Sequence, residues 1–267
     1  MPGAEKTEPK GNLKPQVYLD ERPAEHFTRF HERTRSKRPN WMYEFVRLVL
    51  TPYLLFFFRT RAIDSDKVPA GGPAIVAPNH FSFLDHFFVS VYLRRKVQFM
   101  AKSQLFDKPM EVVYNNGGVF PVRRGRGDEE AFKTAHAILA RGDVVVMYCE
   151  GGRSRTGELG EPKPGIGRLA LESGAPVVPV ALVGSERVRD WKRLQFPKVT
   201  AQFGDPIRFE SVEDPDRAQS QAASEQIFSR ITALWEGLRE NGRSAVVCER
   251  RAARRGGAKA PRQPATR

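Results

Sequence analysis

Two side chains that could move a proton together lie five positions apart, at His80 and Asp85. An unperturbed imidazole has a pKa of about 6.5 and can accept a proton from an alcohol near neutral pH. A carboxylate on its other ring nitrogen would fix the tautomer and stabilise the imidazolium that forms. Side chains on one helix face are three or four positions apart, not five. The pair therefore works only if His80 lies in a turn and Asp85 in the first turn of a helix.

A structural explanation competes for the same residues. The stretch from Ser82 to Asp85 matches a capping box, in which Asp85 would only accept a hydrogen bond from a backbone N–H at the start of a helix. A histidine and an aspartate at this spacing also arise often by chance. At this point the sequence leaves both explanations open.

Basic residues gather where later apolar stretches end. Four arginines share this position: Arg123, Arg124, Arg153 and Arg155. Their planar guanidinium groups match phosphate oxygens, and Gly151 lets the backbone approach a ligand closely. Glu150 would orient the arginines or accept a bond from a substrate hydroxyl. A solvated basic rim is the alternative to a phosphate site.

The elements that position these residues alternate between apolar runs and helical stretches. Apolar runs predict a strand and turn over 63–69 and buried strands over 74–77, 96–100, 117–122, 144–148, 176–183, 199–203 and 206–209. Apolar spacing predicts helices over 109–115, 129–140, 165–173 and 218–239. The alternation predicts an α/β fold with a mixed, mainly parallel sheet flanked by helices. His80 then lies at the carboxyl end of a strand, where open α/β sheets tend to carry their chemistry.

Three further parts surround this α/β domain, which is predicted over residues 61–240. Residues 1–40 are polar and are predicted to be flexible, with a short helix within 18–31 and no cleavable signal peptide. Residues 41–60 are predicted to form an N-terminal membrane-associated helical segment. Residues 241–267 are basic and are predicted to be a disordered tail.

The segment 41–58 is strongly apolar and aromatic. Only 48–58 is uncharged, which is shorter than the roughly 17–25 residues that a spanning helix needs. Pro52 is predicted to kink or divide the segment. Aromatic rings and flanking arginines suit the headgroup boundary, so we expect contact with a membrane interface. A helix packed in the core and a true span are the alternatives.

The formal net charge of +13 points to an anionic partner, whether nucleic acid, an anionic membrane or a phosphorylated substrate. Much of the excess lies in the tail after residue 241. No zinc-finger spacing or basic motif interleaved with aromatic residues favours nucleic acid. Two distant cysteines, Cys149 and Cys248, predict neither a disulfide framework nor a metal cluster and fit a reducing compartment.

Four blocks taken together resemble those of the glycerolipid acyltransferases. They are HFSFLD at 80–85, GVFPVRR at 118–124, YCEGGRS at 148–154 and APVVPV at 175–180. The most similar group is the 1-acylglycerol-3-phosphate O-acyltransferases, and the resemblance covers roughly residues 60–210. Gly152 stands where threonine is usual, and Pro121 where an apolar residue is more familiar. Glycerol 3-phosphate and other lyso-lipids therefore stay open as acceptors.

The resemblance implies direct acyl transfer without a metal or cofactor. His80, oriented by Asp85, would deprotonate the free hydroxyl of 1-acylglycerol 3-phosphate. The hydroxyl would attack the thioester of acyl-CoA or acyl carrier protein and give phosphatidic acid. Residues 177–180 would shape an acyl-chain groove. The implied substrate-binding residues are Lys102, Phe120, Arg123, Arg124, Glu150, Gly151, Arg153 and Ser154.

The implied location is the cytoplasmic face of a membrane, with the protein peripheral or monotopic. The expected partners are the acyl donor, a lysophospholipid and an anionic membrane surface, without nucleic acid. A non-catalytic basic protein that binds membranes or nucleic acid is the alternative from another class. The intact set of His80, Asp85, Glu150 and Arg153 argues against it.

Overall fold

The computed structural model describes residues 20–123, 128–188 and 196–257, which contain one seven-stranded sheet. The strands are β1 (Arg61–Ile63), β2 (Ala74–Pro78), β3 (Val97–Lys102), β4 (Val119–Val122), β5 (Val144–Val146), β6 (Val177–Val183) and β7 (Thr200–Phe203). Their order is β1-β7-β6-β2-β5-β3-β4. The five strands from β6 to β4 are parallel, β7 is antiparallel to β6, and β1 is parallel to β7. The predicted mixed, mainly parallel sheet is confirmed.

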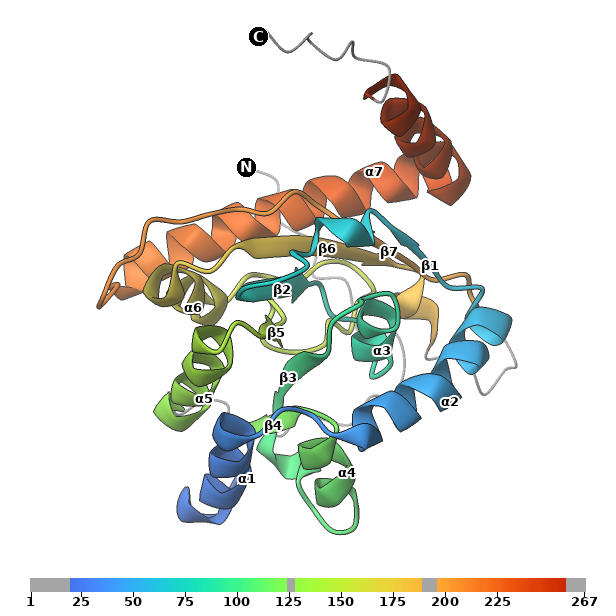
Figure 1. Ribbon diagram of the computed structural model, residues 1–267. Helices are drawn as coiled ribbons and strands as arrows, with labels where there is room; N and C mark the ends of the chain where they lie inside the picture. Colours follow the sequence, from blue (N-terminus) through green and yellow to red (C-terminus); the bar gives the residue numbers. More distant parts are fainter. Residues whose placement is uncertain (1–19, 124–127, 189–195, 258–267) are drawn as a thin grey trace, which may run out of the picture.

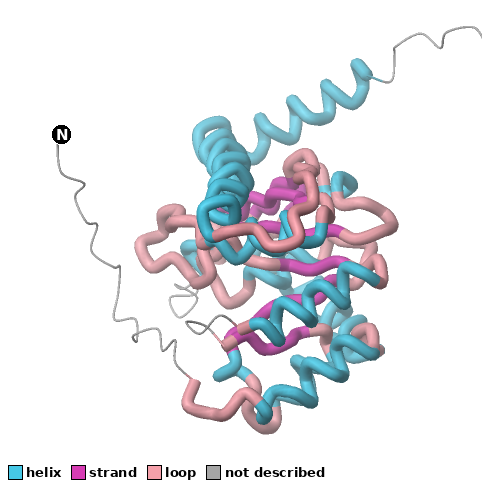
Figure 2. Tube along the Cα trace, turned by 90° about the vertical axis from the view of Figure 1, so that its left-hand side faces the viewer, coloured by secondary structure: helices cyan, strands magenta, loops and turns pink. Residues whose placement is uncertain are grey.

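Helices cover both faces of the sheet (Figure 1). In β2, Ala74 and Val76 join one core cluster and Ile75 and Ala77 the other, as the two-residue period of a strand requires. One cluster packs under α5 (Glu129–Ala140), α6 (Pro164–Ser173) and α7 (Arg217–Gly257). The other packs under α2 (Trp41–Phe58) and α3 (Asp85–Ser90). Figure 2 shows the strands stacked between these layers. Burial on both faces explains the unbroken apolar runs.

The strand predicted at 206–209 does not form. Ile207 makes only an isolated bridge to Val177. Two short 3₁₀ turns, η1 (Ser65–Lys67) and η2 (Ser103–Leu105), complete the connections.

The described part of residues 1–40 packs on the sheet domain where flexibility was predicted, and the short helix predicted within 18–31 overlaps α1. Helix α1 (Glu25–Ser36) buries Phe27 and Phe30, and the ring of Phe30 lies 5.1 Å from that of Phe106. The Arg22 guanidinium donates to the carboxylates of Asp20 and Asp107 and to two carbonyl oxygens near Phe106. Two phenylalanines one turn apart give little periodicity, and the partners of Phe30 and Arg22 lie about 80 positions away along the chain. The sequence pattern therefore did not reveal this packing.

The disordered tail predicted from residue 241 is also wrong as far as residue 257. Gly242 interrupts α7 with φ 73° and ψ 157°, and helix continues beyond it. Val246 is buried against Ile63 and Leu238. The ion pairs that hold this part are Arg250–Asp64, Arg254–Asp64 and Arg254–Asp66. The basic residues read as a solvated tail therefore have acidic partners beside β1.

Helix α2 passes through Pro52 without dividing. The side chain of Asn40 caps its first turn by accepting from the N–H of Met42. In the part of the chain that the structure describes, α2 is the one helix long and apolar enough to cross a membrane. Short helix α4 (Met110–Asn116) lies against it.

We predict that Gly167→Ala destabilises the fold. Gly167 lies where α6 meets α7, and a β-carbon there would lie 1.9 Å from the carbonyl oxygen of Ser220. Overpacking of this kind costs about 1–3 kcal/mol, which chemical unfolding of the detergent-solubilised protein can measure.

Gly237→Ala is the matched control, because a β-carbon on this α7 glycine would meet nothing within 4 Å. Better helix propensity should leave this variant unchanged or stabilise it by up to about 1 kcal/mol. Equal stability of the two variants would contradict the described contact between α6 and α7.

Candidate active site

The predicted site residues come together at one edge of the sheet. The carboxyl ends of neighbouring parallel strands meet there, and the chain leaves β2 at His80, β5 at the loop containing Glu150, and β4 at Arg123. Lys102 is the last residue of β3. Strand β2 lies between β6 and β5, and adjacent strands lie about 4.8 Å apart, so the loop after β5 is one of the two nearest neighbours of His80.

His80 and Asp85 meet the geometric condition set by their spacing. His80 lies in the turn after β2, and α3 begins at Asp85. The Nδ1 atom of His80 lies 2.9 Å from Oδ2 of Asp85, whose side chain is fully buried. A carboxylate only accepts hydrogen bonds, so Nδ1 carries the proton and Nε2 is the basic ring nitrogen.

The capping explanation holds at the same time. Oδ2 of Asp85 also accepts the backbone N–H groups of Phe81 and Ser82, each at 2.7 Å. The Ser82 hydroxyl accepts from Leu84 rather than from Asp85, so only half of a capping box forms. One carboxylate oxygen thus fixes both the turn and the ring. The other, Oδ1, is buried and has no hydrogen-bond partner among the described residues.

The loop after β5 holds the backbone of His80 from both sides. The N–H of His80 donates to Oε1 of Glu150 at 2.9 Å, and its carbonyl oxygen accepts from the N–H of Ser154 at 2.8 Å. Oε2 of Glu150 accepts from Gly160 at 3.1 Å. Glu150 was predicted to bind substrate, but both its carboxylate oxygens are engaged by backbone. Glu150 thus positions the turn in this structure, and the N–H of Ser154 does the same from the other side. Substrate contacts of both residues stay predictions.

Burial changes the protonation of Glu150. Its side chain is largely removed from water, and this desolvation raises the pKa of the carboxyl from 4.5 to about 7, against the lowering effect of the two backbone bonds. The group that joins the two loops therefore titrates near neutral pH.

Sequence reasoning missed Tyr148. Its ring stacks on the imidazole of His80 with centroids 3.8 Å apart and planes 18° apart. Burial raises the pKa of the phenol well above its usual value, so it stays neutral. Tyr148 lies two positions before Glu150 in the third block, but the stack depends on β2 and β5 being neighbours, which no spacing reveals.

His86 was also missed. Burial, and after it the neighbouring His80, lower the pKa of His86 to about 3. It stays neutral at physiological pH and packs among aromatic rings of Phe83, Phe87 and Phe99. His86 therefore puts no second positive charge beside the pair.

Three cationic residues, the cationic arc, follow or end neighbouring strands at the same edge of the sheet as the pair. Arg153 is exposed on the β5 loop, after Gly151, whose φ of 63° favours glycine. Nε of Arg123 is buried and has no hydrogen-bond partner among the described residues. Lys102 lies on β3, between the strands that lead to these two arginines. Arg124 lies outside the described residues. The arrangement brings guanidinium donors to the edge of the sheet that carries His80.

Two predicted substrate contacts need correction. Phe120 is fully buried in the core beneath α5, with Ala135 and Ile138. Residues 177–180 are buried in β6, and Pro179 lines a cavity beside α7 whose lining contains none of the candidate site residues. Both lie on strands that helices cover on both faces. The strand pattern cannot distinguish a residue buried in the core from one that contacts a ligand.

The described geometry agrees with comparisons to known proteins. Residues 59–183 match the family model described as Acyltransferase. This part of the chain is therefore similar to acyltransferase domains.

Relatives of this part of the chain share limited identity. A chloroplastic 1-acyl-sn-glycerol-3-phosphate acyltransferase of Brassica napus is 29% identical over 136 residues, covering 49% of this chain and 39% of that protein. A probable 1-acyl-sn-glycerol-3-phosphate acyltransferase of Mycoplasma genitalium is 30% identical over 131 residues, covering 45% and 48%. The chain thus spans less than half the length of either curated relative.

A solved structure shares the fold of the α/β domain. It is the 1-acyl-sn-glycerophosphate acyltransferase of Thermotoga maritima, with a TM-score of 0.53 and 19% identity, covering 78% of this chain and 88% of that one. At this identity the likeness supports the α/β fold alone.

Within residues 20–123, 128–188 and 196–257, no group of three or more His, Cys, Asp or Glu side chains is placed to hold a metal ion. The α/β domain has one buried free cysteine, Cys149, and Cys248 is exposed on α7.

We predict a pH-dependent contribution of Glu150 to stability. The folded state holds this proton to about pH 7 and the unfolded chain only to about pH 4.5, so the contribution is full below pH 4.5 and is lost as the pH rises to 7. The unfolding free energy of the wild type minus that of Glu150→Gln should fall across this window, by an amount on the order of 3 kcal/mol.

Unfolding titrations at several pH values measure this difference. Glu161→Gln is the control, because Glu161 is an exposed glutamate of the same loop. A difference that stays flat for Glu150→Gln, or that declines equally for Glu161→Gln, would refute the assignment.

Proposed function

We propose that the protein is an O-acyltransferase that moves a fatty acyl group from acyl-CoA or acyl carrier protein to the free hydroxyl of 1-acylglycerol 3-phosphate. The product is phosphatidic acid. The observation that carries the proposal is the His80–Asp85 pair, in which a fully buried carboxylate orients a histidine at the carboxyl end of β2. The acyltransferase-family match and the names of the relatives support it.

In the proposed reaction Nε2 of His80 takes the hydroxyl proton of the acceptor. The oxygen then attacks the thioester carbonyl carbon, the C–S bond breaks, and the sulfur leaves with the proton from the imidazolium. Asp85 stabilises the imidazolium through Nδ1. The stacked ring of Tyr148 adds an electron-rich face, which favours the charged form. The acyl donor is a substrate, and the proposal involves no metal or cofactor.

The acceptor's phosphate is proposed to lie on the cationic arc. Arg153 follows β5, the strand next to β2. Nε of Arg123 is buried and has no hydrogen-bond acceptor among the described residues. Charge-assisted bonds from arginine suit a phosphate dianion. Glycerol 3-phosphate or another lyso-lipid would present the same phosphate, so the arc alone does not choose among acceptors.

Helix α2 is proposed to hold the protein on the membrane surface. Its outer face is apolar and exposed, with Phe56 78%, Leu48 73% and Trp41 66% exposed. Leu54 and Phe58 pack on the domain, so the helix lies along the domain rather than leaving it. Its 18 residues span about 27 Å, less than the roughly 30 Å of a bilayer core.

This arrangement favours a peripheral or monotopic attachment over a span. Phe83, in the turn between His80 and Asp85, is 45% exposed and extends apolar surface to the site. The excess of positive charge favours the anionic cytoplasmic face.

We predict that His80→Ala lowers kcat for acyl transfer to 1-acylglycerol 3-phosphate by roughly 100-fold or more, the usual effect of losing a general base. The measurement is release of CoA from acyl-CoA, run over a panel of 1-acylglycerol 3-phosphate, glycerol 3-phosphate and lysophosphatidylcholine. The panel identifies the acceptor.

His26→Ala is the matched control, because His26 is an exposed histidine of α1 away from the site. It should keep normal turnover. Near-normal turnover of His80→Ala would refute the proposed mechanism. A wild-type protein that is inactive with every acceptor would favour the non-catalytic alternative.

We predict that Leu48→Glu and Phe56→Glu each reduce cosedimentation with anionic vesicles several-fold, because a carboxylate at the centre of the apolar face opposes insertion. Both side chains are exposed, so the fold should be unaffected. Ala218→Glu adds the same charge at an exposed position in the first turn of α7 and should bind as the wild type does. If all three variants sediment alike, the attachment lies elsewhere.

A further inference from the structure

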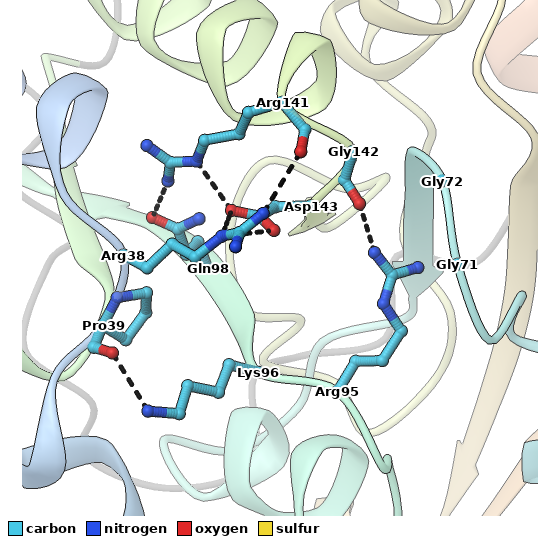
Figure 3. Close-up of a pocket in the computed structure, with 10 residues that line it drawn as sticks. All are labelled: Arg38, Pro39, Gly71, Gly72, Arg95, Lys96, Gln98, Arg141, Gly142 and Asp143. Carbon is cyan, nitrogen blue, oxygen red and sulfur yellow. Dashed lines mark hydrogen bonds and ion pairs between the residues drawn. The ribbon is translucent and has the colours of Figure 1, made fainter.

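A basic cavity of about 480 Å³ lies at the opposite edge of the sheet (Figure 3). Its walls are the segments that lead into β2, β3 and β5, together with the link between α1 and α2. Those three strands are parallel, and His80 follows the far end of β2. The five residues of β2 separate the two places by roughly 17 Å, so this cavity is distinct from the candidate active site.

The charges that line the cavity do not balance. They are the cations Arg38, Arg95, Lys96 and Arg141 and the carboxylate Asp143. Nε of Arg38 lies 3.0 Å from both oxygens of Asp143, and Nε of Arg141 lies 2.6 Å from one of them. One carboxylate thus serves two arginines. Glu44, half exposed at the rim, lies 3.9 Å from Lys96.

The remaining donors are satisfied by neutral groups. Arg95 donates to the carbonyl oxygens of Pro69 and Gly142, and Lys96 donates to that of Pro39 at 3.1 Å. Carbonyl oxygens meet the hydrogen-bonding needs of a cation but bring no net charge. The lining therefore keeps an excess of positive charge that an anion would offset.

A clamp for the link between α1 and α2 accounts for only part of this cluster. Arg141 has that role, since it donates to the carbonyl oxygens of Thr34 and Arg35, and Lys96 shares it through those of Pro39 and Asn40. The side chains of Arg38 and Lys96 are still 65% and 36% exposed, so a ligand can reach both.

The glycines of the wall leave the cavity open. A β-carbon at Gly71 or Gly72 would meet nothing within 4 Å. Apart from the glycines, Pro39 is the one apolar residue in the lining. The cavity therefore suits a polar anion and not an acyl chain. Its volume is in the range of small-ligand sites.

We propose that this cavity is a second ligand site, which binds a phosphate-bearing anion. Guanidinium groups and a lysine around one small cavity match phosphate oxygens in charge and geometry. The ligand would contact Arg38 and Lys96, which border Asn40, the cap of α2. A bound anion would therefore lie next to the amino end of α2. The inference does not depend on the proposed acyl transfer.

Inorganic phosphate is the first probe. The melting temperature of the full chain is followed against phosphate concentration at constant ionic strength, with chloride as the balancing salt. Arg38→Gln with Lys96→Gln should weaken the apparent affinity at least tenfold. Arg208→Gln with Arg217→Gln removes two exposed cations elsewhere and should leave the response unchanged.

A third double variant separates this site from the catalytic edge. Arg123→Gln with Arg153→Gln should keep the cavity's share of the phosphate response, since neither residue lines the cavity. The proposal is overturned if the cavity variant responds as the wild type does, if the wild type does not respond, or if the Arg123 and Arg153 changes abolish the whole response. None of these results depends on acyl-transfer activity.

Vesicles distinguish the two sources of the phosphate. The cavity variant is sedimented with phosphatidylcholine vesicles with and without phosphatidic acid, beside the same Arg208 and Arg217 control. A loss of the phosphatidic acid-dependent part assigns the site to a lipid headgroup. Unchanged vesicle binding with a lost phosphate response assigns it to a soluble phosphorylated molecule. Unchanged behaviour in both assays overturns the site.

Discussion

The carboxylate of Asp85 is the interaction on which the candidate site depends. A fully buried charge is costly unless several donors meet it, and Oδ2 receives three: the His80 ring and the N–H groups of Phe81 and Ser82. Those bonds require a tight turn after β2 and a helix that starts at residue 85. They also fix the imidazole, because the same oxygen holds ring and turn. Removing the carboxylate would therefore disturb both the turn and the base.

The position of the turn after β2 depends on the neighbouring strand β5. The Glu150 carboxylate and the Ser154 N–H hold the backbone of His80, and Tyr148 covers its ring. All three follow β5, which pairs with β2 in parallel. The core of the sheet thus sets the distance between the base and the loop that supports it. Because Glu150 is buried and its pKa is raised to about 7, this support itself changes charge near neutral pH.

The sequence predicted the fold class, nearly every strand and the His80–Asp85 geometry, since each rests on local periodicity or on spacing within one turn. It failed where partners are distant. The roles of Tyr148 and Glu150 depend on which strands are neighbours, and Phe120 looked like a ligand contact because a motif cannot tell core from surface. The packing of α1, though not its helix, and the second part of α7 were missed for the same reason. The sequence pattern predicted solvent-exposed charges in these segments, but in the structure Arg22 pairs with Asp107 and Arg254 with Asp64.

The proposed membrane attachment and the proposed chemistry are connected by the packing of two helices. The ring of Phe58, at the end of α2, meets that of Phe88 in α3 edge to face at 5.4 Å. Helix α3 begins at Asp85, so the helix with the exposed apolar face rests on the one that carries the orienting carboxylate. Exposed Phe83 lies between that carboxylate and His80. An alcohol whose acyl chain stays in the membrane would reach the histidine along this apolar path, without the chain having to enter the polar interior. The basic cavity at the opposite edge borders the other end of α2, at its Asn40 cap. The two ends of α2 thus lie next to the proposed base and the proposed anion site, and the sheet holds both contacts in place.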